Sequence, residues 1–199
     1  MDKYKRYLIP ISILLLVALD QLLKYLIQSN LEIGQTVFLL KGGFGMKYVV
    51  NKGLALGLFK EFEYIRLVGI IFSLIAIPLT LLLYQYYIYK FRRSNWIAAA
   101  LVFVIGGLMG NFLDRIIFGY VRDFLIWPGP PSTPNLADLF VGIGVAMLII
   151  ELFTNPKIKF DLKFRPIRRE IQDIKEFLIF SRNEFTRLLL YVKSIKKSQ

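Results

Sequence analysis

The stretch GNFLDRIIFGYVRDF, residues 110–124, follows directly on the apolar run WIAAALVFVIGGLM, residues 96–109. The apolar run suits a lipid environment, yet the stretch after it carries Asn111, Asp114, Arg115, Arg122 and Asp123. An ionisable side chain at membrane depth is costly unless it is paired or hydrated, so such groups are candidates for function. The fold and the chemistry of the chain therefore depend on what these polar residues meet.

The composition indicates a single membrane-embedded domain that carries out no thiol or imidazole chemistry. Of the 199 residues, 56% are hydrophobic and gather in long blocks, and the mean hydropathy is +0.54. There is no cysteine and no histidine, which excludes disulfides, serine–histidine relays and the usual zinc ligands. Any hydrolysis must use carboxylates, hydroxyls or lysines, and we expect neither a metal nor another cofactor.

Four segments are long and apolar enough to be membrane-spanning helices. They are residues 7–27, 67–87, 96–113 and 137–153. A span needs about 20 mostly apolar residues, and tilt or local thinning of the bilayer accommodates the two shorter segments. We therefore expect an α-helical integral membrane protein with four transmembrane helices.

The basic residues predict the orientation. Of 26 Lys and Arg residues, 18 lie before the first span, in residues 90–93, or after residue 155. Four spans place these regions on one side, and the positive-inside rule makes that side the cytoplasm. The net charge of +12 then reports orientation, and we expect no nucleic-acid partner. Residues 28–66 and 114–136, which hold most of the unusual polar groups, would lie outside.

The basic tail, residues 156–199, is predicted to form a C-terminal amphipathic helix. Its apolar residues recur in alternating steps of four and three, with Ser181 as an interruption. These residues are Ile167, Ile171, Ile174, Leu178, Phe185, Leu188, Val192 and Ile195. Such a helix either lies on the anionic inner leaflet, which we favour, or pairs with another helix.

Two polar clusters precede the opening stretch. Asp20 and Lys24 are spaced i and i+4, which lets them pair and lowers their burial cost, and a structural pair is the simpler interpretation. The second cluster, NKGLALG at residues 51–57, follows a β-branched and aromatic segment, residues 44–50, that favours a short strand. The small residues Gly53, Ala55 and Gly57 suit either a tight packing turn or a binding element.

The third cluster contains two carboxylates that a loop can bring together. Asp123 and Asp138 stand at the two ends of a Pro- and Gly-rich loop that returns the chain to the membrane. Two facing carboxylates cannot both ionise, so one stays protonated while the other activates water, and the two titrate as a pair. An ion pathway and a structural salt bridge are the alternatives that spacing alone leaves open.

Taken together, the clusters resemble the signal peptidase II family, the bacterial prolipoprotein signal peptidases. The matching pieces are Asp20 and Lys24; Asn51-x-Gly53-x-Ala55-x-Gly57; Gly106-Gly107-x-x-Gly110-Asn111-x-x-Asp114-Arg115; Gly119-x-Val121-x-Asp123-Phe124; and Asn135-x-Ala137-Asp138. Each piece alone is weak, but five in the family's order make a specific signal.

The resemblance implies an aspartic endopeptidase of the bacterial inner membrane, with residues 1–155 as its four-span domain. It would act at the extracytoplasmic face on diacylglyceryl-modified prolipoproteins, cleaving before the lipidated cysteine, as a monomer in contact with membrane lipid. The catalytic residues would be Asp123 and Asp138. The positions that would bind substrate or support the site are Asp20, Lys24, Asn51, Gly53, Asn111, Asp114, Arg115 and Asn135.

The resemblance also implies a small extracytoplasmic β-cradle, which residues 38–59 and those after them would supply. The sequence departs from the family pattern at Leu56 and Pro134, where phenylalanine is usual, and this bears on substrate or inhibitor fit rather than on the chemistry. Two rival functions remain: an ion or proton transporter that uses the intramembrane carboxylates, and a membrane scaffold, which explains the spans but not the five motifs.

Overall fold

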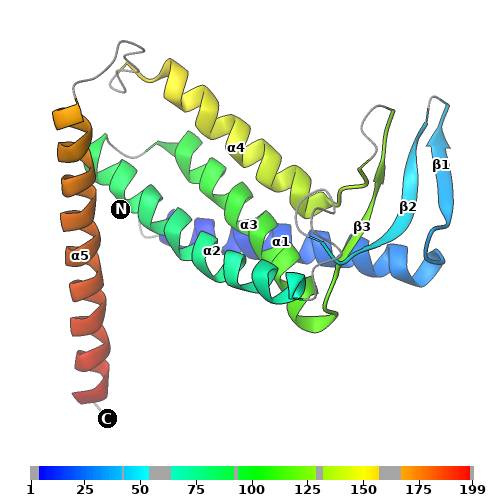
Figure 1. Ribbon diagram of the computed structural model, residues 1–199, viewed down its shortest axis with the longest axis horizontal. Coiled ribbons are helices and arrows are strands. Elements are labelled where there is room, and N and C mark those ends of the chain that lie inside the picture. Colours follow the sequence, from blue (N-terminus) through cyan, green and yellow to red (C-terminus); the bar gives the residue numbers. More distant parts are fainter. Residues whose placement is uncertain are drawn as a thin grey trace.

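The computed structural model describes residues 5–41, 43–53, 64–91, 94–128, 132–156 and 167–197. The helices are α1 (Lys5–Asn30), α2 (Ile65–Lys90), α3 (Asn95–Ile117), α4 (Leu136–Thr154) and α5 (Ile167–Lys197), and the strands are β1 (Thr36–Leu40), β2 (Phe44–Asn51) and β3 (Val121–Ile126). The axes of helices α1 to α4 are roughly aligned and form a bundle. The sheet lies at one end of this bundle, and α5 lies across the other end (Figure 1).

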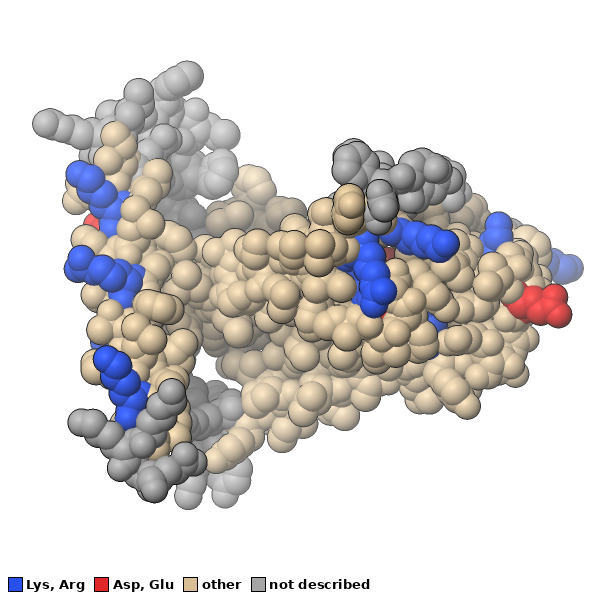
Figure 2. All heavy atoms as spheres, turned by 60° about the horizontal axis from the view of Figure 1, so that its bottom comes forward, with Lys and Arg blue, Asp and Glu red and all other residues tan. Residues whose placement is uncertain are grey.

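The helical bundle has the dimensions and the surface of a membrane domain. Helices α1 to α4 contain the four candidate spans, Tyr7–Asn30, Ile65–Lys90, Asn95–Ile117 and Leu136–Thr154, so the four predicted spans are confirmed. On the face that Figure 2 shows, a broad uncharged belt lies between the basic residues of α5 and the charged residues near the sheet. Exposed leucines, isoleucines and valines in this belt are what a lipid-facing surface requires.

Helix α3 is longer than the sequence predicted. The expected span ended at residue 113 and left Asp114 and Arg115 outside it, but the helix continues to Ile117. Asp114 pairs with Arg122 and Arg115 donates to the Gly53 carbonyl, and these partners offset the cost of placing charged side chains within the protein. Asp114 is in fact completely buried.

Glycines on α3 let its neighbours approach closely. A Cβ at Gly107 would collide with the Ala137 carbonyl oxygen and lie 2.7 Å from Val141 Cγ2, while a Cβ at Gly110 would lie 2.6 Å from Asp20 Oδ2. Small residues of this kind allow the close helix contacts by which membrane bundles pack. Gly107 therefore serves the contact of α3 with α4, and Gly110 serves its contacts with α1 and α4.

The sheet is antiparallel in the order β1-β2-β3, and its third strand was not predicted. Residues 44–50 form a strand as expected, but residues 121–126, interpreted from sequence as a polar segment entering a loop, form β3 beside it, with Val49 opposite Asp123. A tight turn at Gly119, whose φ of +85° favours glycine, leads from α3 into the strand. The later part of the expected cradle, including Leu56, lies outside the described residues.

A small apolar core fixes the sheet to the end of α1. Ile27, Tyr48 and Phe124 are buried together, one each from α1, β2 and β3. Because Phe124 follows Asp123 directly and is fully buried, its packing holds this part of β3 in place. The core thereby fixes the position of a predicted site residue.

Replacing Gly107 by alanine should destabilise the bundle, because the added Cβ meets backbone that cannot move aside. We expect the free energy of unfolding to fall by about 1–3 kcal/mol. Gly142→Ala on α4 is the matched control: nothing lies within 4 Å of its Cβ position, so helix propensity should leave stability unchanged or raised by up to about 1 kcal/mol. Thermal unfolding in detergent measures both, and equal effects would contradict the close approach of α3 and α4.

Candidate active site

Asp123 on β3 and the N-terminus of α4 meet at the sheet end of the bundle, and Asn135 joins them. Asn135 is the N-cap of α4: its Oδ1 accepts a hydrogen bond of 3.0 Å from the Asp138 backbone N–H, and its own N–H donates to Asp138 Oδ2 at 3.2 Å. The Asn135 side chain also donates to Asp123 Oδ1 at 2.6 Å. One residue therefore contacts both predicted catalytic carboxyl groups.

Every oxygen of the two carboxyl groups accepts a hydrogen bond. Asn51 Nδ2 donates to Asp123 Oδ2 at 2.8 Å, and Asn111 Nδ2 donates to Asp138 Oδ1 at 2.7 Å. Together with the two bonds from Asn135, these donors fix the planes of both carboxyl groups. An arrangement held in this way needs little reorganisation when charge moves during a reaction.

The two carboxyl groups differ in their surroundings. Asp123 is 3% exposed, whereas Asp138 is exposed at the first turn of α4. Burial and, after it, the charge of Asp138 raise the pKa of Asp123 to about 7, against the opposing hydrogen bonds from Asn51 and Asn135, which favour the carboxylate. Asp123 therefore retains its proton up to about neutral pH.

Beneath the pair, buried residues of alternating charge connect three elements. Lys24 Nζ lies 2.8 Å from Asp20 Oδ2 and 3.5 Å from Asp114 Oδ2, and Arg122 Nη2 lies 2.8 Å from Asp114 Oδ1. The predicted Asp20–Lys24 pair is thus confirmed as part of a larger network. Two cations balance two carboxylates, as burial requires.

This charged network is bonded to the residues around the carboxyl pair. Lys24 Nζ donates to Asn111 Oδ1 at 3.0 Å, and Asp20 Oδ1 accepts a 2.9 Å bond from the Ala137 N–H at the start of α4. The network therefore positions both α4 and Asn111, the residue that holds Asp138.

Arg115 and Gly53 form the other edge of the site. Arg115 Nη2 donates to the Gly53 carbonyl at 3.5 Å, and its Nη1 donates to the Asn111 carbonyl at 3.4 Å. Its guanidinium group fits beside Gly69 of α2, where a Cβ would lie 2.5 Å from Nε. The Gly53 N–H donates in turn to Asn51 Oδ1 at 2.9 Å, which orients the Asn51 amide toward Asp123.

All ten residues predicted for the site thus lie in one connected set of hydrogen bonds and ion pairs, and their individual roles stay predictions. Ala55, Leu56 and Gly57 lie outside the described residues. The carbonyl of Pro134, the other departure from the family pattern, accepts bonds of 3.1 and 2.8 Å from the N–H groups of Phe124 and Leu125. Within the described ranges, no group of three or more acidic side chains is arranged to hold a metal ion.

Sequence reasoning did not assign Gln21, Gln28 and Arg122 to the site. The buried Arg122 guanidinium donates to Gln28 Oε1 at 3.0 Å and to Gln21 Oε1 at 2.9 Å. The signal for the glutamines was available: together with Lys24 they follow the spacing i, i+3, i+7 and form a polar stripe on an apolar helix. Arg122 stood out as a charged residue after an apolar run, but its partners could not be foreseen because strand β3 was not predicted.

Comparison with known proteins places the chain in a family. The model of a family described as signal peptidase (SPase) II matches residues 12–154. The chain belongs to the signal peptidase II family. A lipoprotein signal peptidase of Halothermothrix orenii is 34% identical over 76% of this chain and 99% of its own length. One from Fusobacterium nucleatum is 36% identical over 72% of this chain and 86% of its own length.

Two solved structures of a bacterial membrane enzyme share the fold of this signal peptidase II. Each is 24% identical in sequence, and the TM-scores are 0.63 and 0.64 over 79% and 74% of this chain and 94% and 93% of the solved chains. The helical bundle with its small sheet is therefore the architecture of an experimentally known membrane enzyme. Family and fold together make this chain a peptidase and a multi-pass bacterial membrane protein.

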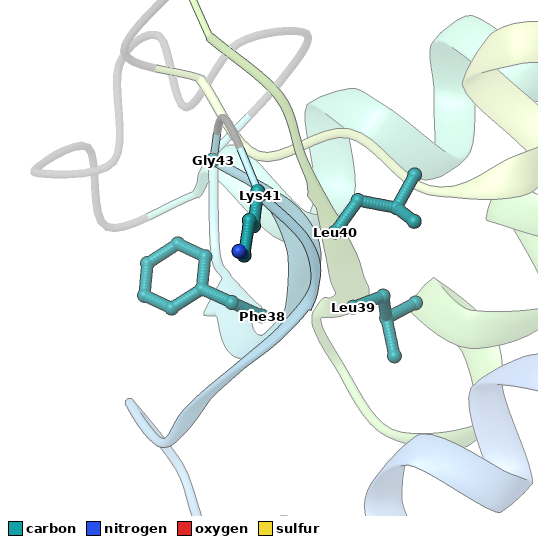
Figure 3. Close-up of a pocket in the computed structure, with 5 residues that line it drawn as sticks. All are labelled: Phe38, Leu39, Leu40, Lys41 and Gly43. Atoms are coloured by element: carbon teal, nitrogen blue, oxygen red, sulfur yellow. The ribbon is translucent and has the colours of Figure 1, made fainter.

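An open hollow at the tip of the β1–β2 hairpin is separate from the carboxyl pair. It has a volume of about 550 Å³ and is lined by Phe38, Leu39, Leu40, Lys41 and Gly43 (Figure 3). Phe38 and Leu40 are both about two-thirds exposed. The hairpin of this signal peptidase II therefore presents an apolar edge at the sheet end of the bundle, and its hollow includes none of the predicted site residues.

Arg122→Gln should destabilise the protein strongly, because it leaves Asp114 buried with only part of its positive partners. Breaking a buried pair in this way lowers the free energy of unfolding by about 3 kcal/mol, and peptidase activity should fall with it because Asp123 adjoins Arg122. The control is Arg187→Gln on α5, whose side chain is 77% exposed and should change stability by less than about 0.5 kcal/mol. Thermal unfolding in detergent that showed equal effects would rule out a positioning role for Arg122.

Proposed function

We propose that Asp123 and Asp138 are the catalytic pair with which this signal peptidase II removes the signal peptide of diacylglyceryl-modified prolipoproteins, before the lipidated cysteine. The observation that carries the proposal is the hydrogen bonding of Asn135 to both carboxyl groups. It joins a buried and an exposed carboxyl group at one end of a membrane bundle. Family membership supplies the substrate class, and the geometry supports the roles of the residues.

In the proposed mechanism the pair shares one proton. Asp138, exposed and at the positive end of the α4 dipole, is the carboxylate that takes a proton from water as the water oxygen attacks the scissile carbonyl carbon. Asp123 donates its proton to the carbonyl oxygen, which gives a neutral tetrahedral intermediate. Proton transfer to the nitrogen then allows the C–N bond to break, and the pair recovers one proton between them.

The supporting residues act through the pair or on the substrate backbone. Asn51, Asn111 and Asn135 hold the carboxyl groups, while Asp20, Lys24 and Asp114 keep α1, α3 and α4 in register beneath them. Arg115 and Gly53 line the approach, where a peptide strand would meet the cradle. One chain supplies every one of these groups, which supports a monomer as the working unit.

We propose an orientation in which the carboxyl pair faces away from the cytoplasm and both termini face it. The Lys and Arg of the segments at the opposite end of the bundle support this orientation through the positive-inside rule. The pair would then lie near the outer leaflet, at the depth of a peptide bond beside a cysteine whose acyl chains are in the membrane. The apolar edge of the β1–β2 hairpin suits contact with lipid or with those chains.

We also propose residues 1–155 as the peptidase domain and residues 156–199 as a separate basic tail. The family match ends at residue 154, and α5 adds no residue to the site described above. The tail would thus affect where the peptidase domain lies in the membrane and not the chemistry.

The rival hypothesis, an ion or proton transporter, is less well supported than the peptidase. A polar cluster not foreseen from sequence lies at the other end of the bundle, where Tyr87 donates to Glu151 and Asn155 donates to both, at 2.9 and 2.8 Å. However, residues 139–150 of α4 and 97–110 of α3 carry no ionisable side chain between the two ends. An ion relay needs such groups along its path.

Asp123→Asn and Asp138→Asn should each lower the cleavage rate of a diacylglyceryl-modified precursor by about 100- to 10,000-fold. The assay is a gel mobility shift with purified protein in detergent, and binding of the uncleaved precursor should persist. Glu151→Gln makes the same carboxyl-to-amide change at the opposite end of the bundle and should leave the rate unchanged. Wild-type rates in both aspartate variants would overturn the catalytic assignment.

The cleavage rate should fall as the pH rises through about 7. The mechanism needs Asp123 protonated, and its pKa of about 7 means that the protonated fraction falls about tenfold for each further pH unit. Asn51→Ala removes a hydrogen bond that favours the carboxylate, so the residual activity should extend to higher pH. A midpoint that moves to lower pH in this variant would contradict the assignment of the proton to Asp123.

A further inference from the structure

The C-terminal helix α5 is attached to the bundle at the level where a membrane span ends. Lys90, the last residue of α2, lies 2.9 Å from Asp173 Oδ1 and 3.6 Å from Glu176 Oε2. Tyr86 packs edge-on against Phe177 and Phe180, with ring centroids 5.3 and 5.4 Å apart. Because α2 is a candidate span that ends at Lys90, this contact holds α5 near the lipid headgroups.

The last turns of α2 have the composition of a membrane boundary. Tyr84, Tyr86, Tyr87 and Tyr89 are followed by Lys90, and tyrosine is enriched where a span leaves the hydrocarbon region. Helix α5 lies across this end of the bundle, and its C-terminal half extends beyond α2 (Figure 1). That half would therefore run along the membrane surface, beside the bundle.

An apolar stripe along α5 is left open in the protein. Its members follow steps of three and four residues, except for one step of seven that spans Ser181. Each of them is between 44% and 62% exposed: Ile174, Leu178, Phe185, Leu188 and Val192, with Leu189 beside them. The stripe is continuous with the apolar side chains that dock on α2. The belt of the bundle is uncharged (Figure 2) and exposes many large apolar side chains, so lipid that covers the belt also reaches the stripe.

The basic side chains seen on α5 lie on the side opposite to the bundle. Lys and Arg side chains follow the edge of the helix that faces away from the bundle, while uncharged atoms face it (Figure 2). The helix has eight Lys and Arg against four Asp and Glu, and two of those acidic residues, Asp173 and Glu176, are paired with Lys90. The docking contact thus neutralises half of the acidic charge and leaves an excess of basic charge for a surface partner.

We propose that α5 is an interfacial helix that inserts its apolar stripe into the leaflet at the α2 C-terminus and binds anionic phospholipid headgroups through Lys175, Arg182 and Lys193. These three residues are spaced seven and eleven positions apart, about two and three helical turns, so they lie along one line of the helix beside the stripe. An apolar face flanked by basic residues binds membranes through burial and through attraction to anionic lipid. The helix thereby fixes the depth and the tilt of the bundle from the end opposite to the carboxyl pair.

The absence of cysteine from the chain allows a direct test with single nitroxide labels on the full-length protein. Leu188→Cys places the label on the apolar stripe. Thr186→Cys places it on the basic side of the helix, one turn after Arg182. The protein is reconstituted in vesicles of phosphatidylcholine with and without 30% phosphatidylglycerol. Power saturation then compares collisions of the label with oxygen, which enriches in lipid, and with a water-soluble nickel chelate.

We expect the label at position 188 to collide with oxygen more than with nickel in the anionic vesicles, and the label at position 186 to show the reverse. Replacing Lys175, Arg182 and Lys193 together by glutamine should lower the ratio of inserted to detached helix about a hundredfold in anionic vesicles, since each basic side chain contributes about fivefold. The same triple variant should behave like the parent in pure phosphatidylcholine.

Three results would overturn the proposal. Nickel access at position 188 in both kinds of vesicle would show that the stripe faces water. Spin–spin broadening at position 188 that disappears on dilution with unlabelled protein would show that a second copy of the chain covers the stripe. Insertion that does not depend on phosphatidylglycerol would remove the role of the anionic headgroups. Cleavage activity is not the readout, so failure here leaves the carboxyl pair unaffected.

Discussion

The ammonium group of Lys24 is the point on which the rest of the site depends. It is fully buried between Asp20 and Asp114 and also donates to Asn111. A buried charge persists only when its partners are held in place, so α1 and α3 must pack in one register. Because Asp20 also accepts a hydrogen bond from the start of α4, the same constraint positions the helix that carries Asp138.

The strand that carries Asp123 is attached to this charged network at a second point. The Arg122 backbone N–H donates to Asp114 Oδ2 at 2.9 Å, and the Arg122 side chain bonds the same carboxylate. Phe124 packs on the other side, in the core with Ile27 and Tyr48. Ionic contacts before Asp123 and apolar contacts after it thus leave the strand one position, which is why the buried carboxyl group can be held against Asn135.

The difference between the two carboxyl groups follows from the elements that carry them. A strand between the bundle and the hairpin buries Asp123, while the open first turn of a helix exposes Asp138. Burial raises the pKa of Asp123 and so favours its protonated form, whereas Asp138 is open to solvent. The fold therefore gives the two carboxyl groups different surroundings, which is the difference that the proposed acid and base roles require.

The sequence alone determined the four spans, the i, i+4 pairing of Asp20 with Lys24, the strand before Asn51 and the amphipathic helix from Ile167, because each depends on periodicity or spacing within a short segment. The order of its motifs also indicated the family. Only the tertiary structure revealed β3, the continuation of α3 past Asp114 and the part played by Arg122. In each of these a charged residue is stabilised by partners far away in the chain, and such partners leave no local pattern to read.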